Sequence, residues 1–325
     1  MRHWAVRIAG TLLLALLGSV LGLVGGLEYN ALGTPPASAR TRGADALWLG
    51  HAWVDGRKGP QDVTALAAQL RGTGVRDLFV HTGPLNHDGT LDPSLYPRAG
   101  WLVTALHRAL PGVRVLSWLG DVVGSAEGPG MDLATADLTG AARQVLDLGF
   151  DGVHLDLEPV HSGDGNFLDQ LGQLRRVTSE RHRLLSVAVP QTDPLPGLHG
   201  IAGLLTNYPK WWSAEYLAQV AHRVDQVAVM AYDTAMPTPS LFAGYEQQQT
   251  RLALGAVPRG VDLLIGLPAY HTDSPTHRAS AETVAAAIRG VRLADDGRPA
   301  FGVALYVDYT ATGADWSAYR RDWVR

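Results

Sequence analysis

Short apolar runs alternate with amphipathic segments along the chain from residue 44 to its end. Several runs are almost continuously hydrophobic, which is typical of parallel strands covered by helices on both faces of a sheet. The expected strands are Leu47–Val54, Asp77–His81, Arg114–Leu119, Gly152–Glu158, Leu184–Pro190, Gln226–Tyr232, Asp262–Tyr270 and Gly302–Asp308. The segments between them repeat apolar residues three and four positions apart, as amphipathic helices do. The expected helices are Asp62–Leu70, Trp101–Leu110, Leu138–Leu148, Phe167–Arg181, Tyr216–Val224, Tyr245–Leu254, Ser280–Val291 and Trp316–Trp323.

A strand followed by a helix, repeated eight times, predicts an α/β protein with a single (β/α)8 TIM barrel. Such barrels typically need about 250 residues, which fits the stretch 44–325. An open doubly wound sheet is the alternative, but no G-x-G-x-x-G sequence follows the first expected strand. We expect no second domain.

The N-terminus is a hydrophobic signal or anchor segment. The stretch Ile8–Leu27 carries no charge and follows Arg2 and Arg7. It is long enough to cross a bilayer core of about 30 Å, and the flanking arginines favour a cytoplasmic N-terminus. Residues 37–39 read Ala-Ser-Ala and resemble a cleavage site, so a cleaved signal stays open. The expected organisation is a signal or membrane anchor at 1–27, a linker at 28–43 and the barrel at 44–325. The barrel is therefore expected outside the cytoplasm, either membrane-anchored or secreted.

Charge and composition narrow the classes of function. The chain has 27 basic and 31 acidic residues and a net charge of −4, which gives no electrostatic case for a nucleic-acid partner. It has no Cys, which excludes disulfides, Cys-ligated zinc, iron–sulfur clusters and cysteine nucleophiles. We expect a monomer that meets the membrane only through its N-terminal segment.

Polar residues recur where the expected strands end. Function in a TIM barrel lies at the carboxyl ends of the strands, so their recurrence there indicates a site. These residues are His51, His81, Asp121, Asp156, Glu158, Gln191, Asp233, His271 and Asp308.

The fourth expected strand gives the strongest signal. Side chains alternate across a strand, so His154, Asp156 and Glu158 share one face, while the residues between them are apolar. Two neighbouring carboxylates repel, which raises one pKa and leaves a protonated acid beside an ionised partner. General-acid cleavage of a glycosidic bond needs that arrangement. A buried polar network that only holds the barrel together is the structural alternative.

Residues 151–158, Asp-Gly-Val-His-Leu-Asp-Leu-Glu, resemble the D-G-x-D-x-D-x-E signature of glycoside hydrolase family 18, the chitinases and endo-β-N-acetylglucosaminidases. Residues 229–233, Val-Met-Ala-Tyr-Asp, are similar to the M-x-Y-D motif of the family's sixth strand. Residues 79–91, 111–117 and 264–270 are similar to its second, third and seventh strands. The resemblance runs from about Leu47 to Asp308.

The resemblance implies roles for individual residues. Glu158 would protonate the leaving oxygen, Asp156 would orient the substrate's acetamido group, and Tyr232 would hydrogen-bond its carbonyl. Asp233 and Met230 would contact the same sugar. This is the substrate-assisted, retaining form of glycoside hydrolysis, with no protein nucleophile, cofactor or metal.

The sequence departs from the family pattern at three expected substrate contacts. His154 replaces the middle Asp of the signature, and it could donate an N–H to Asp156 or, if protonated, hold it as a carboxylate. Tyr306 stands where the family has a Trp under the reacting sugar. Residues 118–121, Trp-Leu-Gly-Asp, replace the usual S-x-G-G, and Trp118 adds a ring for sugar stacking.

The predicted function is hydrolysis of β-glycosidic bonds in N-acetylglucosamine-containing glycans, so the expected partner is a carbohydrate polymer. A sugar-binding barrel without catalysis is the first alternative. The second is a metal-dependent hydrolase, since imidazole and carboxylate groups at barrel ends can bind zinc. Its candidate ligands are His51, His81, His154, His271 and Asp156.

Overall fold

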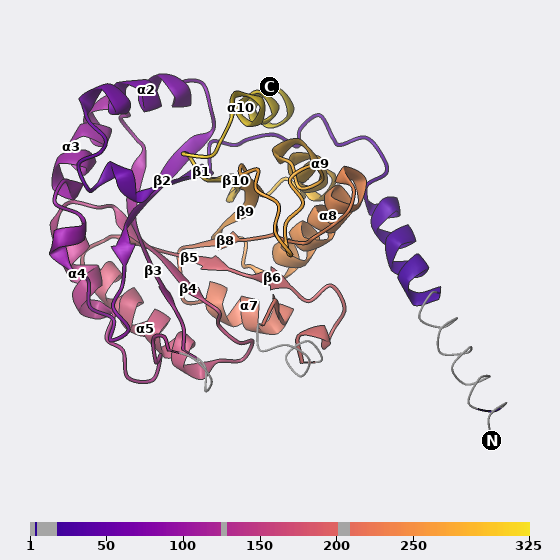
Figure 1. Cartoon of the computed structure of the whole chain (residues 1–325), viewed down its shortest axis with the longest axis horizontal. Coiled ribbons are helices and arrows are strands. Elements are labelled where there is room, and N and C mark those ends of the chain that lie inside the picture. The colour runs from indigo at the N-terminus through magenta and orange to yellow at the C-terminus, as the bar shows by residue number, and fades with distance from the viewer. Residues whose placement is uncertain (1–3, 5–17, 125–128, 201–208) are drawn as a thin grey trace.

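The computed structural model describes residue 4 and residues 18–124, 129–200 and 209–325. Eight parallel strands close into a barrel in the order β1-β10-β9-β8-β5-β4-β3-β2. Figure 1 shows the strands at the centre of the molecule and the helices around them. The predicted α/β barrel with eight strands is confirmed.

The barrel strands are β1 (Asp45–Leu49), β2 (Val75–Pro84), β3 (Arg114–Val122), β4 (Gly152–Glu158), β5 (Leu184–Val189), β8 (Gln226–Val229), β9 (Asp262–Pro268) and β10 (Phe301–Tyr306). The helices around them are α2 (Pro60–Leu70), α3 (Ala99–Ala109), α4 (Thr139–Asp147), α5 (Gly165–Glu180), α7 (Ala214–Ala221), α8 (Pro239–Ala256), α9 (Val284–Ala294) and α10 (Gly313–Tyr319). Two short strands, β6 (Gln191–Thr192) and β7 (Trp211–Trp212), pair outside the barrel.

The strand bounds differ from expectation where the chain leaves the barrel early. β4 has the predicted bounds, but β1 ends at Leu49 because the next residues form a 3-10 helix, His51–Trp53. β8 ends at Val229, and the following loop has positive φ at Asp233 and Ala235. These early exits place polar side chains in loops above the strands.

Side-chain alternation on β4 separates two apolar layers. The residues that point outward belong to the large core between strands and helices, which includes Val153, Leu155 and Leu157. A smaller cluster fills the barrel itself with Trp48, Phe79 and other residues of the inner strand faces. The inner face of β4 therefore meets a packed interior below and the open end of the barrel above.

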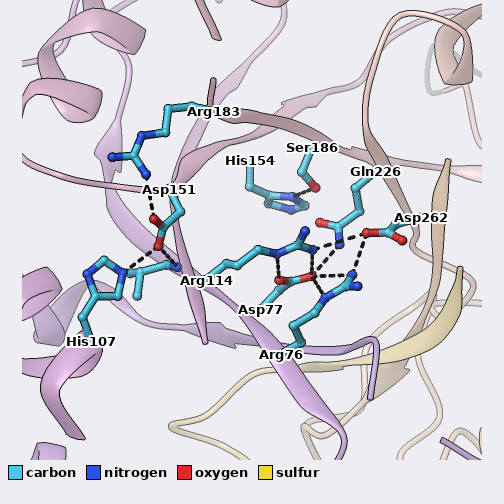
Figure 2. A network of polar contacts seen from close by, with 11 residues as sticks. Arg76, Asp77, His107, Arg114, Asp151, His154, Arg183, Ser186, Gln226 and Asp262 are labelled. Atoms are coloured by element: carbon cyan, nitrogen blue, oxygen red, sulfur yellow. Dashed lines mark hydrogen bonds and ion pairs between the residues drawn. The ribbon is translucent and has the colours of Figure 1, made fainter. Parts of the chain in front are cut away.

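The amino-terminal end of the barrel is closed by paired charges (Figure 2). Asp77 of β2 is fully buried and accepts hydrogen bonds from Arg114 of β3 and Gln226 of β8 at 2.6 and 2.7 Å. Arg76 bridges Asp77 and Asp262 of β9, at 3.2 and 2.6 Å. Because a buried charge is costly unless it is paired, this network lets four strands begin on polar residues inside the barrel.

The expected linker packs against the barrel. Arg289 of α9 donates to the carbonyl oxygens of Ala31 and Gly33, at 2.7 and 3.0 Å. Arg42 pairs with Asp295 at 2.8 Å, and Thr41 donates to the buried Asp45 at 2.6 Å. In Figure 1 the chain passes beside α9 on its way to β1. Composition alone gave no sign of these contacts.

Part of the expected signal or anchor segment lies outside the described residues. Residues 18–30 are helical, and most side chains from 18 to 26 are exposed. Residues 5–17, which supply the first part of Ile8–Leu27, are not described. Among the described residues, no helix is both long enough and apolar enough to span a membrane.

Two truncations should separate the N-terminal helix from the packed segment. Removal of residues 1–26 should leave the melting temperature unchanged. Removal of residues 1–43 should lower it by about 5 °C or more, because hydrogen bonds to charged groups each contribute ~1.5–3 kcal/mol and ~1 kcal/mol shifts Tm by 2–4 °C. Equal melting temperatures in a thermal scan would show that residues 27–43 do not stabilise the barrel.

Candidate active site

Both carboxylates at the end of β4 open into one hollow at the carboxyl ends of the strands. The hollow has a volume of about 660 Å³, within the range of small-molecule sites. Strand β4 supplies the acid pair and the end of β10 supplies Tyr306, while the other residues come from segments that follow β5, β8 and β9. The lining residues are Asp156, Glu158, Pro190, Gln191, Lys210, Met230, Tyr232, Asp233, Tyr270, Thr276 and Tyr306.

Asp156 is held by its neighbours on the strands. Trp118 Nε1 of β3 donates to Asp156 Oδ2 at 2.9 Å. Burial raises the pKa of the Asp156 carboxyl, and hydrogen bonds with Glu158 and Trp118 oppose that rise. Asp156 Oδ1 is buried and has no hydrogen-bond partner in the described part of the chain. A buried acceptor left unpaired costs about 1–3 kcal/mol, and a ligand donor can satisfy this atom only after the carboxylate turns towards the hollow.

Gly120 explains how Trp118 reaches Asp156. A Cβ at position 120 would lie 2.9 Å from the carbonyl oxygen of Asp156, which is closer than side chains tolerate. The glycine therefore allows β3 and β4 to approach at this level, where Gly120 is paired with Asp156. Trp118, a departure from the family pattern, thus supplies the indole donor, while Gly120, which matches a glycine of that pattern, supplies the space for it.

Aromatic rings surround the acid pair. Tyr232 and Tyr306 are stacked, with ring centroids 5.6 Å apart. Tyr270 meets Tyr306 edge to face at 5.9 Å, and Trp118 meets it at 6.1 Å. Burial raises the pKa of Tyr232, so its hydroxyl stays a hydrogen-bond donor at neutral pH. Such rings offer rigid apolar faces with polar tips, which suits the two-sided chemistry of a sugar.

The loop after β8 carries Asp233 in a left-handed conformation, with φ of 60°. Non-glycine residues adopt this conformation only where the surroundings impose it. The buried Glu282 carboxylate imposes it here, since it accepts the N–H groups of Thr234 and Ala235 at 3.1 and 2.9 Å. Tyr270 donates its hydroxyl to Asp233 Oδ1 at 2.6 Å. The side chain of Asp233 is thereby fixed at the rim of the hollow.

His154 is not a substrate contact, which corrects the sequence expectation. It is fully buried below the hollow and stacks on Phe79 with ring centroids 3.8 Å apart. Trp48 Nε1 donates to its Nε2 at 3.1 Å, so its Nδ1 carries the proton and donates to Ser186 Oγ at 2.8 Å. With both ring nitrogens used, the expected N–H donation to Asp156 is also ruled out. Burial lowers the pKa of His154 to about 3, so the ring is neutral.

A second hollow of about 520 Å³ lies beside the first, and Trp118 belongs to its wall. His51, His81 and Asp308 line it too. Burial lowers the pKa of His81 to about 4, and the neighbouring His51 adds to this effect. Asp308 accepts from Trp53 Nε1 at 2.7 Å and from the Gly50 N–H at 2.8 Å, which accounts for a buried carboxylate at this position.

The strand-end residues predicted from the sequence therefore divide into three groups. Asp156, Glu158, Gln191 and Asp233 line the first hollow, together with the expected contacts Met230, Tyr232 and Tyr306. His51, His81 and Asp308 line the second, with Trp118. Asp121 pairs with His87, and His271 pairs with Asp315.

The ligand set expected for a metal-dependent hydrolase does not assemble. His154 is enclosed between Trp48, Phe79 and Ser186, and His271 is bound to Asp315. Among the described residues, the cluster that could hold a metal consists of Asp233, His277 and Glu282 instead.

Sequence reasoning missed Lys210, Thr276, His277 and Glu282. Lys210 and Thr276 line the first hollow, and Lys210 donates to the carbonyl oxygen of Asp233 at 3.1 Å. All four lie in loops and outside any motif, and Glu282 precedes α9 because that helix begins at Val284 and not at the expected Ser280. The only signal available was the length of the segments after β5 and β9.

No protein-family model matches the sequence, and no curated protein matches it. The fold is shared with solved structures. A class V chitinase from Pseudomonas fluorescens Pf-5 is 15% identical, covers 87% of this chain and 99% of its own, and has a TM-score of 0.56. A chitinase from Chromobacterium violaceum is 17% identical, covers 87% and 99%, and has a TM-score of 0.58. The spore cortex-lytic enzyme SleL of Bacillus megaterium is 14% identical, covers 89% and 76%, and has a TM-score of 0.60.

The suspected resemblance to glycoside hydrolase family 18 is therefore supported. At these identities the likeness is one of fold. It places β4 of this chain in a barrel of the kind that chitinases use.

Acid should destabilise the folded protein through His154. The pKa of this residue is about 3 in the folded state and near 6.5 in a model peptide, so between these values the unfolded state binds a proton that the folded state does not. Stability therefore falls as pH drops from about 6.5 towards 4. His154→Gln should make the melting temperature less sensitive to pH in this window, whereas exposed His222→Ala should not. Parallel pH curves for wild type and His154→Gln would refute the assignment.

Proposed function

We propose that this protein hydrolyses β-glycosidic bonds in N-acetylglucosamine-containing glycans, with Glu158 as the general acid. The observation that supports the proposal most directly is the placement of Asp156 and Glu158 side by side in a hollow walled by aromatic rings. A carboxylate pair on one strand face is costly to build unless chemistry needs it. Solved chitinases with the same fold add support.

Substrate-assisted hydrolysis suits the arrangement of the hollow. The carbonyl oxygen of the substrate's 2-acetamido group attacks the anomeric carbon while Glu158 protonates the departing oxygen. Asp156 turns its unpaired oxygen towards the hollow and takes the acetamido N–H, and Tyr232 donates to the acetamido carbonyl. Positioning makes the attack effectively unimolecular, which can lower the barrier by several kcal/mol. Water then opens the cyclic intermediate, with Glu158 acting as the base.

Neighbouring residues take supporting roles in this proposal. Trp118 keeps Asp156 in place through its indole N–H. Tyr306 forms the aromatic floor where it stacks with Tyr232. Met230 and Asp233 contact the sugar from the side of β8. No metal or cofactor takes part in these steps.

We further propose that the barrel acts outside the cytoplasm as a monomer on a carbohydrate polymer. The uncharged run at Ile8–Leu27 behind two arginines supports export. Whether the segment is cleaved or kept as an anchor decides between a secreted and a membrane-attached enzyme. Mass spectrometry of the N-terminus of the exported protein distinguishes the two forms.

Glu158→Gln should remove turnover and leave glycan binding intact. The amide keeps the shape of the side chain but cannot supply the proton, and general-acid assistance typically contributes about 10²–10⁴-fold. Hydrolysis of chitin oligosaccharides is measured by product mass, and binding by calorimetry. Glu180→Gln, on an exposed position of α5, is the matched control and should keep wild-type activity.

Retention of more than about a tenth of the activity, against the 10²–10⁴-fold loss expected for a missing acid, would show that Glu158 is not the acid. A wild-type protein that binds these oligosaccharides and never cleaves them would instead be a sugar-binding barrel.

The substrate should need an N-acetyl group on the sugar next to the scissile bond. Without it the attacking carbonyl oxygen is missing, so neutral β-glucans and fully deacetylated chitosan should not be cut. The β configuration should be retained, and thiazoline analogues of the cyclic intermediate should inhibit. Proton NMR at early reaction times measures the anomeric configuration directly. An inverted product, or rapid cleavage of a plain β-glucan, contradicts the mechanism.

A further inference from the structure

A histidine and two carboxylates meet behind the rim of the first hollow. Asp233 lies in the loop after β8, and His277 and Glu282 lie in the segment between β9 and α9. One donor atom from each lies within 4.8 Å of the others. His277 Nδ1 is 3.4 Å from Asp233 Oδ1 and 3.5 Å from Glu282 Oε2, and the His277 side chain is 1% exposed.

These distances do not fit an ordinary ion pair. Charge-assisted N–H···O bonds are about 2.7–2.9 Å long, so both contacts of His277 Nδ1 are too long by more than half an ångström. Neither ring nitrogen of His277 has a hydrogen-bond partner within the part of the chain that the structure describes.

We propose that Asp233, His277 and Glu282 bind a divalent transition-metal ion of the Zn²⁺ type. Zinc holds nitrogen and oxygen ligands at about 2.0–2.2 Å in a tetrahedron, in which neighbouring ligand atoms are about 3.4 Å apart. The two distances from His277 Nδ1 match that edge. An imidazole ligand favours zinc over Mg²⁺ and Ca²⁺, which prefer oxygen. A water molecule or a substrate hydroxyl on the side of the hollow completes the coordination.

The surrounding groups orient the proposed ligands. Tyr270 donates to Asp233 Oδ1 at 2.6 Å, and the Thr234 N–H donates to Glu282 Oε2 at 3.1 Å. Ligating carboxylates in metal sites are commonly held by such outer hydrogen bonds. The Ala235 N–H holds the other oxygen of Glu282 at 2.9 Å. Both carboxylates are therefore fixed before any ion arrives.

Two further titratable groups face the cluster. Lys210 interacts with Glu282 and Asp233 electrostatically, and its ammonium group donates to the backbone carbonyl oxygen of Asp233. Burial lowers the pKa of Lys210, which reduces its competition with a cation. Glu246 of α8 lies near Glu282, and burial raises its pKa well above the usual value, which favours its neutral form.

The ion would hold Asp233, and with it one wall of the first hollow, without touching Glu158 or Asp156. Metal binding at this site does not depend on the proposed hydrolysis. A protein that binds zinc but cleaves no glycan would fail the proposed function and keep this inference. A protein that cleaves glycans but binds no zinc would support the proposed function and overturn this inference.

The experiment uses tag-free protein, so that no purification tag binds metal. After treatment with a chelator and gel filtration, the protein is titrated with Zn²⁺ by calorimetry, and its metal content is measured by plasma mass spectrometry. One equivalent of zinc is expected, with a rise in Tm of about 5 °C at saturating zinc. Mg²⁺ and Ca²⁺ should give no shift. Replacement by Co²⁺ should give the visible absorption of a four-coordinate ion.

His277→Gln and Asp233→Asn should each lose the bound zinc and the thermal shift. His222→Ala, which removes an exposed histidine from the end of α7, should bind like wild type. Circular dichroism checks that the variants are folded. Zinc content of wild type no higher than that of the buffer, or equal zinc binding by wild type and folded His277→Gln, overturns the proposal. If His277→Gln does not fold, the cobalt spectrum of wild type decides.

Discussion

Polar groups inside a closed barrel cannot be hydrated, and this constraint determines how inward side chains are arranged from one end of the barrel to the other. Each inward polar side chain must find a partner on a neighbouring strand, or pay the cost of desolvation. At the amino-terminal end, Asp77 is matched by Arg114, Arg76 and Gln226. One level up, His154 is neutral and joined to Trp48 and Ser186. At the open end, Asp156 is only half satisfied. The unpaired atom thus belongs to a side chain that lines the hollow.

This ordering explains how the chain replaces the second Asp of the family signature. An Asp at position 154 would need donors, and the indole of Trp48 and the hydroxyl of Ser186 surround that position. A neutral imidazole uses both, as acceptor from one and donor to the other. The consequence is that Asp156 does not exchange a proton with residue 154. Its hydrogen bonds go to Trp118 and Glu158 instead.

The fold and the acid pair could be predicted because they depend on local periodicity. Continuous apolar runs identify strands covered on both faces, and alternation places Asp156 and Glu158 on the inner face of β4 without any knowledge of neighbours. The position of His154 was equally predictable, but its partners were not. Trp48 is 106 residues away in the sequence and Ser186 is 32 away. Whether His154 contacts Asp156 or these partners depends on which residues of β1 and β5 lie at the same level of the barrel as residue 154.

The remaining parts of the site depend on loops, where sequence spacing carries little information. Lys210 reaches the hollow because β6 and β7 form a small sheet beyond β5. A strand of two residues is too short to be predicted from hydrophobic periodicity. Segment 28–43 looked like a linker because proline and small residues are common in linkers. Here their backbone carbonyls are instead bound by arginines of α9.

Strands and loops position different groups of the site. Strands hold the acid pair, and β3 is paired with β4 from residue 116 to residue 122, so the acid pair is fixed by continuous strand pairing. Loops hold the other groups that line the first hollow. Asp233 sits in a left-handed turn that is stable only because Glu282, nearly fifty residues later, accepts its neighbours' N–H groups. In the proposed reaction, changes in the segment before α9 would therefore alter how a glycan is held, while proton transfer at Glu158 would depend on β4.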